Sequence, residues 1–209
     1  MKKYILIFST FLVFGCSKHE GANNNERNFF DGFYRDDSYG GTYERMSQTR
    51  LLQGGFENYF EAVITYWNSE LRKSFVREMA RAYRMTDAET QLLESEELKE
   101  DDRYFTFIVS ASSREDRWRD LDGSNSLWRL SLENTDGSVR VRPDRIELVS
   151  VKDDRWKFFY RSMNRFNKTF RIRFLKKDLE SSSHLHLHIS GPLGGVSTKF
   201  QTSVVDPNR

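Results

Sequence analysis

The strongest constraint on the fold is a change in the spacing of apolar residues near Tyr104. Between Phe56 and Met85, apolar residues recur every three or four positions, which places them along one face of a helix. From Tyr104 onward, apolar and polar residues alternate, as they do in strands that have one buried face. The sequence therefore predicts an α+β chain in which a helical part precedes a β-rich part.

Residues 56–103 are expected to form an N-terminal helical hairpin. The buried face of its first helix would consist of Phe56, Phe60, Val63, Trp67, Leu71, Phe75 and Met79. Thr86 and Glu89 match a capping box, in which a hydroxyl and a carboxylate bind free backbone N–H groups where a helix begins. A second helix is expected over 87–99, with fraying after Leu98 because acidic side chains at a helix C-terminus oppose its dipole. We expect it to bury Ala88, Leu92 and Leu93, and to direct some of its acids toward Arg77, Arg81 and Arg84.

Residues 104–205 are expected to contain roughly seven or eight short strands separated by turn-forming pairs such as Asp136-Gly137. Their apolar members are Phe105, Phe107 and Val109; Trp128, Leu130 and Leu132; Val139 and Val141; Ile146 to Val151; Trp156, Phe158 and Tyr160; Phe170, Ile172 and Phe174; Leu185, Leu187 and Ile189; and Val196, Thr198 and Phe200. This series predicts an antiparallel β-sandwich. An immunoglobulin-like topology is the first choice and a small barrel is the second.

The first fifteen residues have the organisation of a secretory signal. Lys2 and Lys3 precede an apolar run that is shorter than the about 20 residues needed to span a bilayer. The run ends at Val13-Phe14-Gly15-Cys16, which resembles the lipobox of bacterial lipoproteins. The resemblance implies cleavage after Gly15 by signal peptidase II and a lipid anchor on the sulfur of Cys16. The alternative is an ordinary signal peptide with an incidental cysteine.

The lipobox resemblance places the protein in the cell envelope. Ser17, where lipoproteins of the inner membrane often carry Asp, favours the outer membrane if the cell is Gram-negative. Residues 16–28 are polar and are expected to form a flexible tether behind the lipid. Residues 29–55 are expected to be an irregular aromatic segment. Four of its aromatic side chains, Phe29, Phe30, Phe33 and Tyr34, would pack on the folded part.

Charge and cysteine content exclude some classes of function. The chain has 33 Lys and Arg against 31 Asp and Glu, and removal of residues 1–15 removes Lys2 and Lys3, which leaves 31 against 31. A neutral chain has no electrostatic basis for binding nucleic acid, so no nucleic-acid partner is expected. Cys16 is the only cysteine, and its lipidation would exclude disulfides, thiol catalysis and cysteine-based metal sites.

Three groups of polar residues are candidates for a site. His184, His186 and His188 share one face of a predicted strand and are low-probability metal ligands, because three histidines in a flat row rarely enclose an ion. We expect them to be the solvated side of a strand that buries its leucines. A second group resembles a calcium loop but has no acid at its final ligand position, so a polar connection is favoured; it consists of Asp116, Asp120, Asp122, Asn125 and Ser126.

The third group is a set of cations in the last third of the chain, Arg161, Arg165, Lys168, Arg171, Arg173, Lys176 and Lys177. Arg171 and Arg173 are expected on one exposed strand face, as ordinary surface charge or as contacts to anionic headgroups or an acidic partner. Ser190 to Gly195 is glycine-rich but is expected to be a hairpin turn, and the chain has no GxSxG, HExxH or phosphate-loop motif.

Together with a later Pro, the segments SLWRLSLENTDG, TFRIRFLKK and LHISGPLGG resemble the C-terminal part of exported bacterial lipoproteins of unassigned function. That resemblance implies no activity and no site residues. We therefore expect a non-enzymatic structural or protein-interaction role in the envelope, without a cofactor. The membrane, reached through the lipid on Cys16, and an envelope protein are the expected partners. The alternative is a lipoprotein that binds a ligand, a glycan or a lipid, and an enzyme ranks third.

Overall fold

The computed structural model describes residues 37–54, 57–122, 126–150, 154–179 and 183–202. The signal segment, Cys16, the expected tether and the aromatic side chains of Phe29, Phe30, Phe33 and Tyr34 lie outside these ranges. In chain order the elements are α1 (Asp37–Arg45), β1 (Ser47–Gly54), β2 (Glu57–Tyr66), α2 (Ser69–Tyr83), α3 (Asp87–Arg103), β3 (Tyr104–Ser112), η1 (Asp116–Arg119), β4 (Arg129–Glu133), β5 (Arg140–Val141), β6 (Arg145–Leu148), α4 (Asp154–Phe159), β7 (Lys168–Leu175), η2 (Lys176–Asp178), β8 (His184–Gly191) and β9 (Gly194–Gln201).

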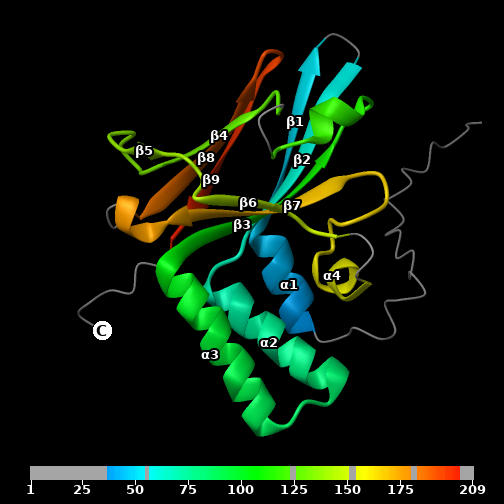
Figure 1. The fold of residues 1–209 in the computed structure, drawn as a ribbon, viewed down its shortest axis with the longest axis vertical. Helices are drawn as coiled ribbons and strands as arrows, with labels where there is room; N and C mark the ends of the chain where they lie inside the picture. Colours follow the sequence, from blue (N-terminus) through cyan, green and yellow to red (C-terminus); the bar gives the residue numbers. More distant parts are fainter. Residues whose placement is uncertain (1–36, 55–56, 123–125, 151–153, 180–182, 203–209) are drawn as a thin grey trace, which may run out of the picture. The chain divides into compact units, whose positions relative to one another are not determined.

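The strands form two antiparallel sheets, in the orders β1-β2-β3-β7-β6 and β5-β4-β8-β9 (Figure 1). Alternate residues of β3, β4, β7 and β8 are apolar and point between the sheets, where the facing sides of the two sheets enclose the main core. Phe107 and Ile172, which are paired across β3 and β7, are fully buried there with Leu132 and Leu187, which are paired across β4 and β8. The predicted α+β class and the sandwich-like pair of sheets are confirmed.

The outer edges of the two sheets meet along β1 and β9. Gln48 on β1 donates to the carbonyl of Lys199 at 2.7 Å, and Arg50 donates to the carbonyl of Ser197 at 2.9 Å. Thr198 also donates to the Gln48 side chain at 2.6 Å. Because these bonds occupy carbonyl groups of an edge strand, the seam reduces the tendency of the sheets to pair with other chains.

A layer that contains α1, α2 and α4 covers the other face of the five-stranded sheet (Figure 1). Ile108 points from β3 into this second core, where Trp67, Phe75 and Phe159 are also buried. The rings of Phe75 and Phe159 meet edge to face, with 4.8 Å between their centroids. The helices therefore do not form a core of their own but share one with the sheet.

The order of the strands corrects the immunoglobulin-like topology. In an immunoglobulin domain the third strand belongs to the second sheet. Here β1, β2 and β3 are neighbours in one sheet, and β4 is the first strand of the other. Strands β1 and β2, which were not predicted from the sequence, extend the first sheet.

The expected helix over 56–85 is wrong in its first half. Residues 57–66 form β2, and α2 begins at Ser69 after Asn68, whose side chain accepts a hydrogen bond from the Leu71 N–H. Ala62 and Ile64 are fully buried at an alternating spacing that the helical interpretation overlooked. The run Val63-Ile64-Thr65 is β-branched, which favours a strand. The helical pair α2–α3 therefore lies between β2 and β3, and the described residues do not support a hairpin N-terminal to the strands.

The second helix begins as predicted, because both hydrogen bonds of the Thr86–Glu89 capping box are present. Its buried face and its end differ from the expectation. Ala88 and Leu92 are exposed, Leu93 is half-buried, and the helix continues to Arg103 without fraying after Leu98. The surface that α3 covers is charged rather than apolar, so acidic residues make its contacts.

Two other segments differ from their predicted structure. Residues 37–54, expected to be irregular, form α1 and β1: Tyr39 and Tyr43 are buried one helical turn apart, and β1 is a largely polar edge strand without an apolar alternation. Trp156, Phe158 and Tyr160 were expected on a strand, but residues 154–159 form α4. There Phe159 and Tyr160 are buried against α2 and β3 in the second core. The other strands predicted after Tyr104 are present as β3 to β9, but the one expected from Ile146 to Val151 ends at Leu148, and Val151 lies outside the described residues.

Candidate functional site

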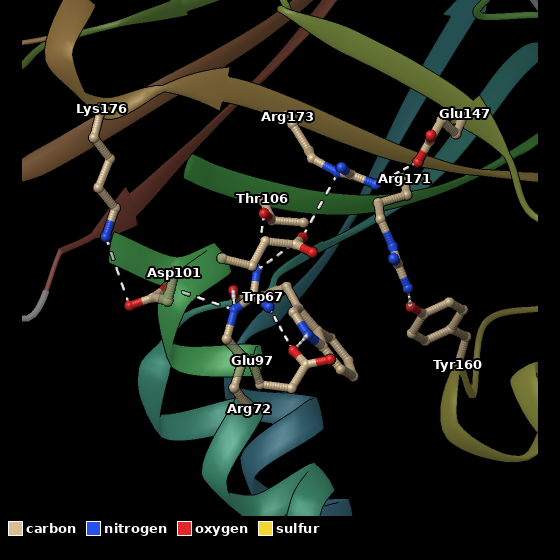
Figure 2. A network of polar contacts seen from close by, with 11 residues as sticks. Trp67, Arg72, Glu97, Asp101, Thr106, Glu147, Tyr160, Arg171, Arg173 and Lys176 are labelled. Carbon is tan, nitrogen blue, oxygen red and sulfur yellow. Dashed lines mark hydrogen bonds and ion pairs between the residues drawn. The ribbon is translucent and has the colours of Figure 1, made fainter. Parts of the chain in front are cut away.

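Arg72 is the centre of a polar network that joins two helices to the five-stranded sheet (Figure 2). It lies in the first turns of α2, where helix packing against β3 leaves its side chain only 1% exposed. Its Nε donates to the carbonyl of Trp67 at 3.1 Å, and its Nη2 donates to the Thr106 hydroxyl on β3 at 2.9 Å. A buried guanidinium requires both hydrogen bonds and a counter-charge.

Helix α3 supplies the counter-charge. Glu97, Glu100 and Asp101 lie on one face of the helix, at spacings of three and four residues. Their carboxylate oxygens lie 2.5, 3.4 and 3.6 Å, respectively, from nitrogens of Arg72. Glu97 also accepts a hydrogen bond from the indole N–H of Trp67 at 3.3 Å. Arg72 therefore joins α2, α3 and β3.

Two further cations connect α3 to the sheet. Arg173 on β7 lies between Glu100, at 3.6 Å, and Glu147 of β6, with which it forms a short ion pair. Lys176 lies 3.6 Å from Asp101. Beside them, Arg171 donates to the Tyr160 hydroxyl at 2.8 Å, with its guanidinium 5.3 Å from the Trp156 ring centroid (Figure 2).

Burial changes the acidity of two groups in this network. Burial raises the pKa of Asp101, although the nearby Lys176 and Arg72 act in the opposite direction. Burial also raises the pKa of the Tyr160 hydroxyl, against the effect of Arg171. Asp101 therefore accepts a proton more readily than an exposed aspartate, and Tyr160 stays neutral and accepts the hydrogen bond from Arg171.

The arrangement is that of a structural charge network. Each of the four cations Arg72, Arg171, Arg173 and Lys176 contacts a carboxylate or a phenol of this chain. This network was not predicted from the sequence, which led us to expect some of the acids of α3 to face Arg77, Arg81 and Arg84. Two sequence patterns could have indicated the network. The spacing of Glu97, Glu100 and Asp101 gives an acidic face on a helix, and the alternation of Arg171 and Arg173 gives a basic face on a strand.

Arg171 and Arg173 share one face of β7, as predicted, but that face is not exposed. Both side chains are half-buried beneath the helical layer, and the side chain of Arg173 is 13% exposed. The alternation showed which residues share a face but could not show that helices cover it. The expected exposed basic strand is therefore corrected.

The predicted histidine strand is confirmed as β8, with Leu185, Leu187 and Ile189 fully buried. His184, His186 and His188 lie half-buried on the other face of the four-stranded sheet. His188 Nε2 lies 3.0 Å from the Glu133 carboxylate, which also binds Arg140. The rings of His186 and His188 are 6.3 Å apart. Within the described ranges, no three His, Cys, Asp or Glu side chains are grouped so that they could hold a metal ion.

The aspartates of the calcium-like segment bind cations of the protein. Asp116 lies 2.6 Å from Arg119 and 3.6 Å from Lys168, and Asp120 lies 3.4 Å from Lys168. The Asp120 side chain also accepts a hydrogen bond from the Asp122 N–H at 3.1 Å. Asn125 lies outside the described residues, and Ser126 donates to the carbonyl of Asp120 at 2.8 Å.

A surface hollow is present where β4 begins and β8 ends. It is lined by Ser126, Leu127, Trp128, Arg129, Ser190, Gly191 and Pro192. Gly191 permits this arrangement, because a Cβ atom at that position would lie 2.6 Å from the Trp128 ring. Pro192 and Leu193 connect β8 to β9, so the predicted hairpin turn is confirmed.

The fold and the network define an α+β protein with two antiparallel sheets and a helical layer held by buried charge. No family model, no curated protein and no solved structure matches the chain. None of the described helices is both long enough and apolar enough to span a membrane.

Proposed function

We propose that this chain is a lipid-anchored protein of the bacterial cell envelope. The observation that carries the proposal is the N-terminal sequence, in which Lys2 and Lys3, an apolar run and Val13-Phe14-Gly15-Cys16 follow in the order of a lipoprotein signal. Cys16 would carry the lipid, and Ser17 favours the outer membrane in a Gram-negative cell. The membrane, reached through this lipid, is the first proposed partner.

The proposed role of the folded part is non-enzymatic, either structural or in binding another envelope protein. The charges of the network around Arg72 are used to attach a helix to a sheet, which supports a structural interpretation. Several large apolar side chains are exposed and offer contacts to a partner. They are Leu51, Tyr59, Tyr83, Leu92, Leu148, Phe166 and Leu193.

The alternative is a lipoprotein that binds a ligand, a glycan or a lipid. The hollow beside Trp128 favours it, since an aromatic side chain and the exposed cation Arg129 lie there together with the hydroxyls of Ser126 and Ser190. Aromatic surfaces with a few polar groups are typical of small-molecule sites. Crosslinking in intact cells followed by purification would distinguish the two roles, because the first yields a protein partner and the second a small molecule.

The test of lipid anchoring is the substitution Cys16→Ser. Wild-type protein is expected to incorporate radiolabelled palmitate and to partition into the detergent phase, because acyl chains on Cys16 bring it there. The variant is expected to lose the label and to keep its signal segment. Labelling that persists in the variant would contradict the proposal.

A further inference from the structure

The turn between α4 and β7 holds one aromatic side chain in solvent. Phe166 is 64% exposed, the largest exposed fraction among the large apolar side chains of the described residues. An isolated exposed apolar residue is common in proteins. This one is distinguished by the number of bonds that fix the backbone around it.

Side chains at three positions hold this turn. Asn164 accepts a hydrogen bond from the Phe166 N–H at 2.8 Å. Asn167 accepts from the Asn164 N–H at 3.1 Å and donates to the carbonyl of Ser162 at 2.6 Å. From η1, Arg119 donates to the carbonyl of Phe166 at 2.7 Å. The backbone is therefore ordered before binding, so presenting the ring costs little further conformational entropy.

The turn is basic as well as apolar. Residues 161–168 include Arg161, Arg165 and Lys168 and contain no acid. Arg165 lies over the Phe166 ring, with 4.6 Å between the guanidinium carbon and the ring centroid, and has no carboxylate partner within the described ranges. Arg119 and Lys168 engage the nearby acids Asp116 and Asp120. An exposed aromatic ring beside an unpaired arginine matches a surface of apolar chains beneath anionic headgroups.

The segment that enters the turn lies beside the first described element of the fold. Helix α1 begins twenty-one residues after Cys16 and packs on the segment that enters the turn (Figure 1). The Tyr39 hydroxyl donates to the carbonyl of Phe159 at 2.5 Å, Tyr43 and Ser162 share a hydrogen bond of 3.1 Å, and Glu44 lies 3.2 Å from Arg161. The first described element is therefore bonded to the segment that enters the turn.

We propose that the turn at Arg165-Phe166 is a second membrane contact, in which the ring enters the interface of an anionic bilayer and Arg165 binds phosphate groups. This proposal rests on lipid anchoring at Cys16, which brings the fold to the membrane. The turn then needs only a weak affinity of its own for the bilayer. The contact would orient the fold on the bilayer instead of leaving it free on its tether.

The test places a fluorophore at the turn of the full-length, lipidated protein. With Cys16 acylated, the substitution Phe166→Cys introduces the only free thiol, which is labelled with nitrobenzoxadiazole. Leu92→Cys on α3 is the matched control, because Leu92 is 62% exposed and lies outside the turn. Both proteins are reconstituted in vesicles of phosphatidylcholine and phosphatidylglycerol that contain a spin-labelled quencher lipid.

The label at position 166 is expected to shift its emission to the blue and to lose most of its intensity to the quencher, while the label at position 92 does neither. Adding Arg165→Glu, or omitting phosphatidylglycerol, is expected to reduce the quenching. Equal behaviour of the two labels would overturn the proposal. Shielding of position 166 in native envelopes but not in pure lipid vesicles would also overturn it, because a protein would then cover the turn.

Palmitate incorporation separates this proposal from the proposed function. If the wild type incorporates palmitate but the label at position 166 is not quenched, lipid anchoring at Cys16 is supported and the membrane contact at Phe166 is overturned. If palmitate is not incorporated, the anchor fails. The label is then tested in a Cys16→Ser, Phe166→Cys variant added to vesicles from solution, where quenching would support the contact and its absence would overturn it.

Discussion

Arg72 shows how one buried charge organises the helical layer. Its guanidinium is shared among a backbone carbonyl, a hydroxyl and three carboxylates from elements that are distant in the sequence. Removing a charge from water is costly, so such a group is stable only when its partners are already in place. The residue therefore makes the position of α3 depend on the packing of α2 against β3.

We expect Arg72→Met to destabilise the fold by about 3 kcal/mol, near the lower end of the cost of breaking a buried ion pair. The lower end applies because the three carboxylates stay 14 to 26% exposed and regain some hydration. Denaturant unfolding measures the change. Arg45→Met is the matched control, since its ion pair with Glu70 is 60% and 53% exposed and should contribute at most about 1 kcal/mol. Similar losses in both variants would show that Arg72 is not a buried centre.

Asp101 carries a pH dependence of defined sign. Burial places its pKa in the folded protein above that in the unfolded chain, so the folded state binds the proton more tightly. Its contribution to stability is complete below the unfolded pKa, about 4, and is lost as the pH rises through the raised folded pKa. Asp101→Asn removes this titration.

The free energy of unfolding of Asp101→Asn, relative to wild type, is therefore expected to increase as the pH rises above about 4. Urea unfolding over a pH series measures the difference. Asp102→Asn, at the exposed neighbouring position, is the control for removing one negative charge from the end of α3. If the difference in the free energy of unfolding between Asp101→Asn and wild type does not change with pH, the pKa of Asp101 is not raised by folding.

At the scale of elements, α3 shows how a helix without a buried residue is held in place. The Thr86–Glu89 capping box fixes its beginning, and Glu97, Glu100 and Asp101 bind its C-terminal half to three cations. Acids in the last turns of a helix oppose its dipole, which predicted fraying. The nearby guanidinium groups reverse that preference, so the helix continues to Arg103.

Strand β8 is held by its leucines rather than by its histidines. We expect the triple variant of His184, His186 and His188 to alanine to fold with a stability within about 0.5 kcal/mol of wild type, the range of ordinary surface substitutions. Glu133 would keep its ion pair with Arg140 in that variant. The control Leu187→Ala should cost about 2–5 kcal/mol, because it empties a fully buried position.

The same triple variant tests metal binding, which remains a prediction. We expect one equivalent of zinc to leave the melting temperature of the wild type unchanged, because a tight site would stabilise the native state by mass action. Differential scanning calorimetry measures it. A zinc-dependent rise in the wild type that the variant lacks would establish a metal site in the histidine row.

At the scale of the whole molecule, the five-stranded sheet has two dissimilar partners. One face packs on the four-stranded sheet through apolar side chains, and the other carries the helical layer through a mixture of aromatic rings and ion pairs. The seam between β1 and β9 joins the two sheets at one edge through side chains that bind carbonyl groups. Loss of the network around Arg72 is therefore expected to affect the helical layer before the sandwich.

The sequence alone determined the features that depend on neighbouring residues. The alternation in β3, β4, β7, β8 and β9 and the capping box at Thr86 are local, because spacing and side-chain chemistry within one turn or one strand define them. The interpretation of Cys16 rests on residues next to it in the chain and remains a prediction.

Only the tertiary structure decided what depends on distant partners. Residues 57–66 satisfy both a helical and a strand spacing, and pairing with β1 and β3 selected the strand. The polar sequence of β1 does not by itself indicate a strand. It fits a strand because β1 lies at the edge of the five-stranded sheet. In the sequence, Arg72 resembles a solvated residue of a helix. In the structure it is buried, because the acids of α3 supply its counter-charge. Hydrogen bonds and counter-charges from remote elements outweigh local preference at these positions, and local spacing carries no information about them.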